Sequence, residues 1–358
     1  MKVTLLIISY LLVSNFSFCQ YFSGPESVEF DAANNRYLVS NRGSVKSIQS
    51  VVPGQAPSLF SSNVGSPAGL EILGGKLWSC DGARIKSYDL TTGTLVDNVN
   101  LGATFLNGIT NDGNKFLFVS DFSAKKIYRF NIETLDYFEM VSNTVSTPNG
   151  MWYDGANDRL LFVNWGTNAP IKAVSLIDST LSTVANTSIG NCDGITRDAA
   201  GNYFVSAWSQ QSVYKFDSNL LNPVPVVTSL SNPADIFYNL TNDTLAVPNS
   251  QNNTVTYHYF GTLGLSNLSS QENSVMVYPN PTNDEINILF TLESANEVAV
   301  QLYNSTGQLV FQGQQKFDNT GRNELTFSTT NLPTGTYNYV LLLGEKAESG
   351  SLNVLKGF

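Results

Sequence analysis

The stretch TPNGMWYDGANDRLLFVNWG, residues 147–166, places Asn149 and a glycine at the mouth of a segment that alternates like a β-strand and ends in tryptophan. The stretch NCDGITRDAAGNYFVSAW, residues 191–208, repeats the arrangement with Asp193 before the glycine. Each stretch holds an Asp/Asn/Gly turn between two short alternating runs, which is the signal of a β-hairpin. The repetition predicts a fold built from copies of one unit.

Six such units follow one another along the chain. Their glycine column, defined as the residue after the oxygen-bearing one, consists of Ser27, Gly69, Gly108, Gly150, Gly194 and Asp235. The spacings are 42, 39, 42, 44 and 41 residues by subtraction of these numbers. A period of about 40 to 45 residues is typical of propeller blades. Three strands per unit are evident and a fourth fits the remaining length. The predicted fold is therefore all-β, with a six-bladed β-propeller over residues 20–260.

Composition sets the class of protein and of partner. The 358 residues are 42% hydrophobic and only 13% charged, with a formal net charge of −10. A folded, β-rich, extracellular protein has this balance. The charge balance offers no basic face for phosphate backbones, so nucleic acid and anionic membranes are not expected as partners. We expect a monomer.

The N-terminal residues 1–19 have a lysine, an apolar run and small residues, which predicts a secretory signal peptide cut after Cys19. Lipidation of Cys19 is an alternative, although the preceding Phe18 fits that signal poorly. Cys80 and Cys192 then remain. They fall in blades two and five, across the ring, and are expected to be free, buried thiols.

Beyond the propeller, residues 261–274 are small and polar and read as a linker. Residues 275–358 are short alternating runs separated by Pro, Gly and Asn, the pattern of a small antiparallel β-sandwich. This segment resembles the C-terminal sorting domain of the type IX secretion system of Bacteroidota, through Tyr278-Pro279-Asn280-Pro281, LYNSTGQLV, NLPTGTY and Lys356. The resemblance implies passage through the periplasm, recognition by the secretion machinery, and a secreted or cell-surface protein.

The residues before the glycine column form a predicted inner ring around the propeller axis, namely Glu26, Ala68, Asn107, Asn149, Asp193 and Ala234. Four of them carry oxygen atoms. Glycine follows Asn107, Asn149 and Asp193, and is expected to let the backbone turn without a Cβ obstructing the axis. Carboxylate and amide oxygens suit a hard divalent cation, Ca²⁺ first, with Mg²⁺, Mn²⁺ or Zn²⁺ as alternatives.

This spacing resembles the senescence-marker-protein, gluconolactonase and regucalcin family of six-bladed propellers, and more distantly the strictosidine-synthase-like and NHL propellers. The likeness rests on Glu26 four residues before Phe30, on Asn149-Gly150-Met151 and on Asp193-Gly194-Ile195. It implies one metal held by Glu26, Asn149 and Asp193, with Asp193 also the catalytic acid/base. The sequence departs from the family in lacking a counterpart of its substrate-binding arginine and its Pro-Val-Trp signature.

Two alternatives stay open for these residues. Asp, Asn and Gly at the starts of strands also occur in β-turns, where they adopt positive φ or cap the turn with their side chains. For Asn107 this turn interpretation stands equally beside ligand binding. Asn107, Asp121, Trp165 and Trp208 are further candidates for ligand binding, since aromatic walls over a polar floor suit sugars, lactones or peptides. The tryptophans could instead pack between blades.

His258 is the single histidine, so a Ser-His-Asp triad and multi-histidine metal sites are excluded. The predicted function is a secreted or cell-surface propeller that binds a ligand on its axial face. It is either a metal-dependent, lactonase-like hydrolase or a non-catalytic module for a small molecule, glycan, peptide or protein.

Overall fold

The protein is described by a computed structural model for residues 22–53, 55–260 and 275–356, apart from residues 293, 295, 305, 306 and 345. It divides into two compact units that meet in sequence between Phe260 and Gly261. The predicted signal peptide, the alternative at Cys19 and the predicted linker lie outside the described residues.

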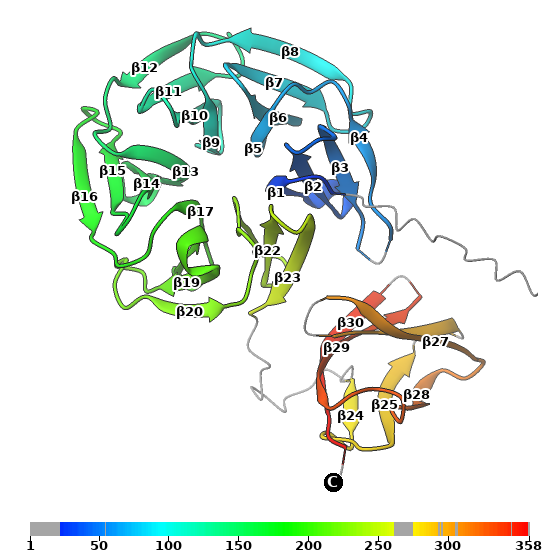
Figure 1. The fold of residues 1–358 in the computed structure, drawn as a ribbon. Coiled ribbons are helices and arrows are strands. Elements are labelled where there is room, and N and C mark those ends of the chain that lie inside the picture. The colour runs from blue at the N-terminus through cyan, green and yellow to red at the C-terminus, as the bar shows by residue number, and fades with distance from the viewer. Residues whose placement is uncertain are drawn as a thin grey trace, which may run out of the picture. The chain divides into compact units, whose positions relative to one another are not determined.

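Unit 1 is a ring of antiparallel sheets, with the first strand of each nearest the centre and the last at the rim (Figure 1). Five sheets have four strands in sequence order. They are β1 (Pro25–Asp31), β2 (Arg36–Asn41), β3 (Ser47–Val51) and β4 (Ser58–Ser61); β5 (Pro67–Leu73), β6 (Lys76–Asp81), β7 (Arg84–Asp89) and β8 (Leu95–Asn100); β9 (Leu106–Asn111), β10 (Phe116–Asp121), β11 (Lys126–Asn131) and β12 (Tyr137–Val141); β13 (Thr147–Asp154), β14 (Arg159–Trp165), β15 (Ile171–Ser175) and β16 (Leu181–Ala185); β17 (Cys192–Arg197), β18 (Tyr203–Ala207), β19 (Ser212–Phe216) and β20 (Val224–Val227).

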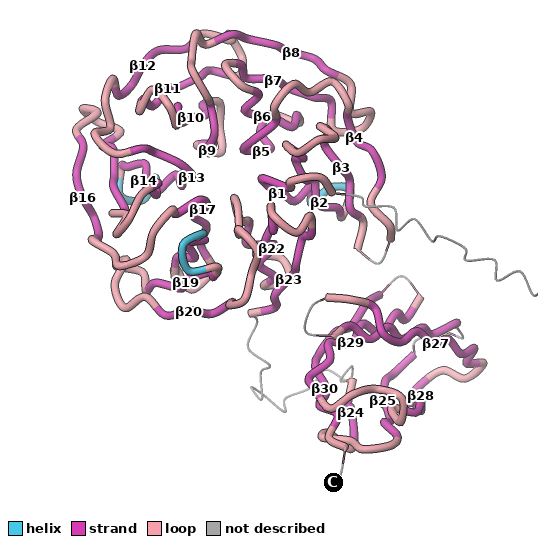
Figure 2. Tube along the Cα trace, in the orientation of Figure 1, coloured by secondary structure: helices cyan, strands magenta, loops and turns pink. Residues whose placement is uncertain are grey.

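The sixth sheet has three strands in the described part of the chain: β21 (Phe237–Asn239), β22 (Thr244–Asn249) and β23 (Thr254–Tyr259). The predicted six-bladed propeller is confirmed, whereas the predicted fourth strand is present in five blades. Only short 3-10 helices interrupt the strands, at η1 (Ala32–Asn34), η2 (Gly155–Asn157) and η3 (Trp208–Gln210) (Figure 2).

Blade 6 adjoins blade 1 without exchanging a strand with it in the described residues. The two meet through a parallel bridge between Ser27 and Asp235, whose side chains are also hydrogen-bonded at 2.8 Å. The amide of Gly24 donates to Oδ1 of Asn253 at 2.6 Å. These contacts form the seam of the ring.

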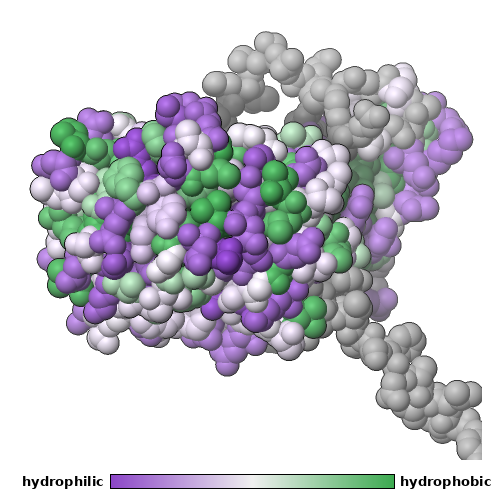
Figure 3. Space-filling view, turned by 90° about the horizontal axis from the view of Figure 1, so that it is seen from above, coloured by the Kyte–Doolittle hydropathy of each residue, from purple (hydrophilic) through white to green (hydrophobic). Residues whose placement is uncertain are grey.

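Apolar side chains that face neighbouring sheets hold the blades together. Because blades are twisted and face one another, the middle strands are buried on both faces: β10 carries Leu117, Phe118 and Val119, all nearly inaccessible. Phe118 and Leu117 belong to different clusters, one on each side of the blade. Each such burial contributes about 1.5 to 3 kcal/mol, so the ring is stabilised blade by blade. On the face of the rim that Figure 3 shows, hydrophobic and hydrophilic residues are intermixed.

The glycine column has a different cause from the one expected. A Cβ on Gly108 would lie 2.1 Å from the carbonyl oxygen of Asn149, and one on Gly150 would lie 2.4 Å from that of Asp193. Neither glycine has a positive φ. Glycine is thus required because the first strand of the next blade approaches too closely for a side chain, and neither the axis nor a turn with positive φ imposes it.

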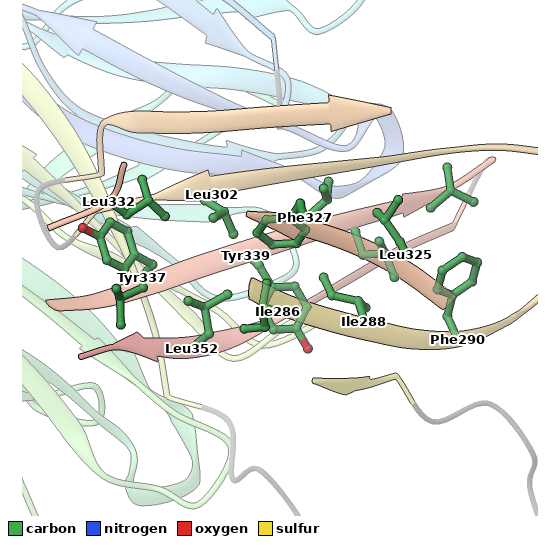
Figure 4. Packing of buried hydrophobic residues seen from close by; sticks show 14 of the residues in the cluster. Ile286, Ile288, Phe290, Leu302, Leu325, Phe327, Leu332, Tyr337, Tyr339 and Leu352 are labelled. Carbon is green, nitrogen blue, oxygen red and sulfur yellow. The ribbon is translucent and has the colours of Figure 1, made fainter. Parts of the chain in front are cut away.

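Unit 2 is a β-sandwich of two antiparallel sheets. One contains β24 (Met276–Tyr278), β25 (Glu285–Leu292) and β28 (Gly321–Ser328), and the other contains β27 (Leu309–Phe317), β26 (Asn296–Tyr303), β29 (Gly335–Leu343) and β30 (Lys346–Val354). Side chains of both sheets meet between them, among them Ile286, Ile288, Leu302, Tyr339 and Leu352 (Figure 4). Alternation along β25, buried at every second residue, is what the sequence pattern predicted.

Cys80 and Cys192 are buried and free, as predicted. Burial raises the pKa of both thiols, that of Cys192 to about 12, so neither is a reactive thiolate at neutral pH. Within the described part of the chain, no helix has the length and apolar character needed to span a membrane.

Candidate functional site

The inner ring is formed by the starts of the first strands, which the glycine column brings close together. Glu26, Asn107, Asn149 and Asp193 are all buried, with at most 6% of each residue exposed. Asn107 and Asn149 are in contact although 42 residues separate them, because Nδ2 of Asn107 donates to Oδ1 of Asn149 at 2.6 Å. The predicted convergence of these side chains from different blades is therefore present in the structure.

Glu26 is held by an ion pair. Its Oε1 accepts from Nη1 of Arg42 at 3.0 Å. Arg42 follows β2 in the same blade, and its guanidinium carbon lies 4.5 Å from the ring centroid of Phe105, in blade 3. Burial raises the pKa of Glu26, and the adjacent guanidinium opposes that effect. The side chain of Arg42 thus extends from blade 1 past blade 2 to blade 3. Blade 2 contributes only the small side chain of Ala68 to the inner ring.

Asn149 joins three blades. Its oxygen accepts from Asn107, and its Nδ2 donates to the carbonyl oxygen of Cys192 at 3.1 Å. A further hydrogen bond from Asn149 to Asp193 lowers the pKa of that carboxyl. The N–H side of the Asn149 amide therefore faces blade 5, and its oxygen faces blade 3.

Asp193 is the most strongly perturbed carboxyl of the inner ring. Burial raises its pKa well above the ordinary value, and the nearby charges of Glu26 and Asp235 raise it further. Arg42 lowers it only in part. In the described residues no salt bridge reaches Asp193, so it is a buried carboxyl that favours its protonated form.

Four aromatic rings border the ring of polar residues and form a continuous series, here called the aromatic arc: Phe105, Phe122, Trp165 and Trp208. Neighbouring centroids are 5.8, 5.9 and 5.2 Å apart in that order, each pair edge to face. The arc extends over blades 3, 4 and 5 and is continued by Arg42, which stacks on Phe105. All four rings are only partly buried.

The arc and the inner ring lie on the same face of the propeller, because each residue of the arc pairs with the chain just before an inner-ring residue. The amide of Phe122 donates to the carbonyl of Phe105 at 2.9 Å, and that of Trp208 to Asn191 at 3.1 Å. Trp165 is the register partner of Thr147, two residues before Asn149. The aromatic arc thus lies along one side of a buried, hydrogen-bonding centre, over blades 3 to 5.

Two donors of this site lack an acceptor. Nε of Arg42 and Nε1 of Trp208 are buried and have no hydrogen-bond partner among the described residues. Buried N–H groups are rarely left unpaired, since each costs about 1 to 3 kcal/mol. The site therefore has unused capacity to donate, next to carboxyl oxygens that can accept.

Asp121 has a different position from its predicted partners. It is fully buried, and its carboxylate accepts from the amides of Thr104, Phe105 and Ala124 at 2.7, 3.1 and 2.9 Å. Asp121 thereby fixes the loop that carries Phe105 and does not face the inner ring. Its role is to position the aromatic arc.

Sequence reasoning placed Arg42 and Phe122 at the ends of second strands on this face without assigning them to the site, and it did not single out Phe105, or Asp235 beyond its place in the glycine column. A signal for Arg42 exists: Asn41-Arg42-Gly43, at the end of the second strand of blade 1, has the same form as Asn164-Trp165-Gly166, at the end of the second strand of blade 4. No local signal marks Phe105, since its role depends on stacking with a residue 63 positions earlier, by subtraction of the two numbers.

The metal set predicted from the sequence fits this geometry incompletely. Glu26 and Asp193 are close enough for their charges to interact. Asn149, however, directs N–H rather than oxygen toward Asp193, and Arg42 already pairs with Glu26. No group of three or more His, Cys, Asp or Glu side chains suited to a metal ion occurs in the described chain.

Residues 276–352 match the family model described as the secretion system C-terminal sorting domain. Unit 2 is therefore a sorting domain, and the protein is exported through the periplasm to the cell surface or the medium. The sorting domain implies interaction with the type IX secretion system. The match accounts for the sandwich alone, and no curated protein matches the chain in sequence.

Solved structures similar to the propeller share its fold at low sequence identity. A gluconolactonase from Xanthomonas campestris has a TM-score of 0.55 at 15% identity, covering 64% of this chain and 84% of its own. A protein of unknown function from Bacteroides thetaiotaomicron has a TM-score of 0.54 at 12% identity, covering 66% and 69%. The Cps50 (Swd1) propeller domain from Myceliophteria thermophila has a TM-score of 0.51 at 10% identity, covering 67% and 98%. These likenesses establish a β-propeller and leave function to the site.

Proposed function

We propose that this exported propeller binds a carbohydrate on the face that carries the inner ring and the aromatic arc, without cleaving it. The observation that supports this most is the pairing of four partly exposed aromatic rings with a centre that offers both donors and acceptors. A sugar ring presents an apolar face for stacking and hydroxyl groups that donate and accept at once.

The electrostatics of the centre favour a neutral, polyhydroxylated ligand over a charged one. Glu26 and Arg42 form an ion pair, and burial raises the pKa of Asp193. A ligand hydroxyl that accepts from the N–H groups of Arg42 and Trp208 requires a side-chain movement, because both nitrogens are buried and unpaired in the described structure. An apolar peptide segment would leave those groups unpaired, at a cost in affinity.

Tryptophan fluorescence tests the proposal with a panel of neutral oligosaccharides, including β-glucan, xylan and mannan fragments. We expect saturable quenching by at least one of them, lost in Trp165→Ala and in Trp208→Ala. Phe138→Ala is the matched control, because Phe138 is half exposed on the outer strand β12, away from this face. Absence of binding across the panel would contradict the assignment of a carbohydrate.

A metal-dependent, lactonase-like hydrolase is the second candidate. The proximity of Glu26 and Asp193 favours it, because a divalent cation would relieve the burial of both carboxylates. The residues as placed do not present three free oxygens: the Asn149 amide would have to turn over and Arg42 to release Glu26.

Thermal melting with Ca²⁺, Mg²⁺ or Mn²⁺ separates the two candidates. The carbohydrate-binding module should melt at the same temperature with or without each ion. A rise that EDTA reverses and that Asp193→Asn abolishes, together with hydrolysis of gluconolactone, would favour the hydrolase. At an ion concentration 100 times its Kd, linkage alone would stabilise the wild type by about 2.7 kcal/mol.

A further inference from the structure

The two tryptophans of the aromatic arc come from different blades, and one short crossover contacts the loops of both. Trp165 ends β14 in blade 4, and Trp208 begins η3 in blade 5. Their rings meet edge to face, with centroids 5.2 Å apart and planes at 73°. Residues 187–191 lead from β16 to β17 and are hydrogen-bonded to the chain beside each tryptophan.

Asn191 is bonded to both tryptophan loops at once. On the side of blade 4, its Oδ1 accepts from the amide of Gly166, the residue after Trp165, at 3.1 Å. Its own amide donates to the carbonyl oxygen of Gly166 at 2.8 Å. On the side of blade 5, its carbonyl oxygen accepts from the amide of Trp208 at 3.1 Å. One residue therefore connects the two tryptophans through three hydrogen bonds.

Gly190 completes the connection through its backbone. Its amide donates to Oε1 of Gln210 at 3.0 Å, and its carbonyl oxygen accepts from the amide of Ser209 at 3.2 Å. A Cβ on Gly190 would lie 2.9 Å from Oγ of Ser209 and 3.0 Å from the carbonyl oxygen of Gly166. The crossover thus fits closely between the two loops, and neither loop has room to move toward the other.

The position of Asn191, two residues before an inner-ring residue, has the same backbone role in other blades. In blade 1 the carbonyl oxygen of Gly24 accepts from the amide of Arg42, and in blade 3 that of Phe105 accepts from Phe122, both at 2.9 Å. Glycine and phenylalanine have no side-chain acceptor. The link back to the loop of the preceding blade is therefore a property of the asparagine.

We propose that Asn191 is a positioning residue, which sets the orientation of Trp165 relative to Trp208 and thereby the surface that the ligand contacts. This inference rests on the proposed binding of a carbohydrate. A sugar stacks on the face of an aromatic ring, so the tilt between two adjacent rings determines which ligand contacts both. The φ of Asn191 is 50°, in the left-handed region that few residues other than glycine and asparagine adopt readily. Asparagine combines this backbone conformation with the side-chain acceptor.

Circular dichroism and oligosaccharide binding test this role in the full chain. The two adjacent indoles should give a coupled band in the wild type, which Trp165→Phe and Trp208→Phe each remove. Asn191→Gly keeps the backbone conformation and removes the acceptor. It should lose most of the band and bind the β-glucan, xylan or mannan fragment that quenches wild-type fluorescence roughly tenfold more weakly. Asn191→Asp retains an acceptor oxygen and should restore both.

Asn35→Gly is the matched control. Asn35 has a φ of 46° and is exposed after η1 in blade 1, and its side chain has no hydrogen bond within the described chain. This variant should change neither the band nor the affinity. A wild type without the coupled band, an unchanged band in Asn191→Gly, or a lost band with unchanged affinity would overturn the role of Asn191. If none of the fragments binds the wild type, the proposed function fails, and the band alone then decides whether Asn191 sets the tryptophan pair.

Discussion

At the scale of single residues, the close approach of neighbouring blades decides which side chains are permitted. Gly69, Gly108, Gly150 and Gly194 each face the backbone of the next blade at a distance that excludes a Cβ. The two exceptions, Ser27 and Asp235, meet at the seam and bond to each other. Sequence spacing located this column correctly, but its cause lies in a contact between residues about 40 positions apart.

Gly108→Ala should destabilise the propeller by about 1 to 3 kcal/mol or more, because the new methyl group would lie 2.1 Å from the Asn149 carbonyl and the strands would have to move apart. Differential scanning calorimetry of the full chain measures the loss. Gly335→Ala, in the sandwich and with only an ordinary contact near its Cβ, is the control. Equal melting of both variants would contradict the packing argument.

Asp235 should make the propeller less stable as the pH rises. Burial raises its pKa to about 7 in the folded protein, whereas an unfolded aspartate titrates near 3.9. Between about pH 4 and pH 7 the folded state thus holds a proton that the unfolded state has lost, so unfolding becomes easier with rising pH. Asp235→Asn keeps an acceptor for Ser27 and should melt above the wild type at pH 8.

A pH series of melting temperatures checks this expectation for Asp235. The exposed-carboxylate variant Glu133→Gln should follow the wild type at every pH. Part of the dependence should survive in Asp235→Asn, because burial also raises the pKa of Glu71, to about 8. A wild type that is more stable at pH 8 than at pH 5 would contradict the raised pKa values of Asp235 and Glu71.

At the scale of elements, the ends of the second strands fix the loops that bring the chain into each blade. Asp81 accepts from the amide of Gly65 at 2.8 Å, Asn249 from that of Ser231 at 3.2 Å, and Asp121 from three amides. The sequence analysis offered loop capping as one role for the Asp and Asn residues of the inner ring. In the structure, Asp or Asn at the end of the second strand has that capping role. The position of the aromatic arc depends on this capping, because Asp121 holds the loop that carries Phe105.

Asp121→Ala should lower stability by about 1 to 3 kcal/mol, since three buried or partly buried amides lose their acceptor. It should also weaken carbohydrate binding, because the loop that carries Phe105 is no longer held. Asp178→Ala removes an exposed aspartate that caps only its own turn and serves as the control. Unchanged binding in Asp121→Ala would show that the arc is positioned by other contacts.

How far the sequence predicts the molecule depends on the range of the interaction. Strand alternation and blade spacing are local, so the propeller, the sandwich and the positions of Asn149 and Asp193 could be predicted. The bond from Asn107 to Asn149 and the pair between Glu26 and Arg42 depend on blade contacts and side-chain direction. No local sequence pattern indicates these two contacts. They nevertheless determine whether the inner ring presents oxygen atoms to a metal.

At the scale of the whole molecule, the two units have separate cores. The sandwich cluster contains only residues from 275 onward, and the propeller clusters only residues up to Phe260. Deletion of residues 273–358 should therefore leave a folded propeller that remains in the periplasm, because the domain read by the secretion machinery is gone. Cell fractionation with protease protection measures this, and surface delivery of the truncated chain would contradict it.

The contacts at the seam, between blade 1 and blade 6, bring the two ends of the propeller sequence together. Every blade is made from one uninterrupted stretch of the described chain, and Gly24 at its start is bonded to Asn253 near its end. Among the described blades, the seam is the boundary that no chain connection crosses, and noncovalent contacts close it. A permuted gene that joins blade 6 to blade 1 and begins at blade 4 should encode the same ring, with the contact between Ser27 and Asp235 now between blades that the chain connects and the contact between Gly108 and Asn149 now at the seam.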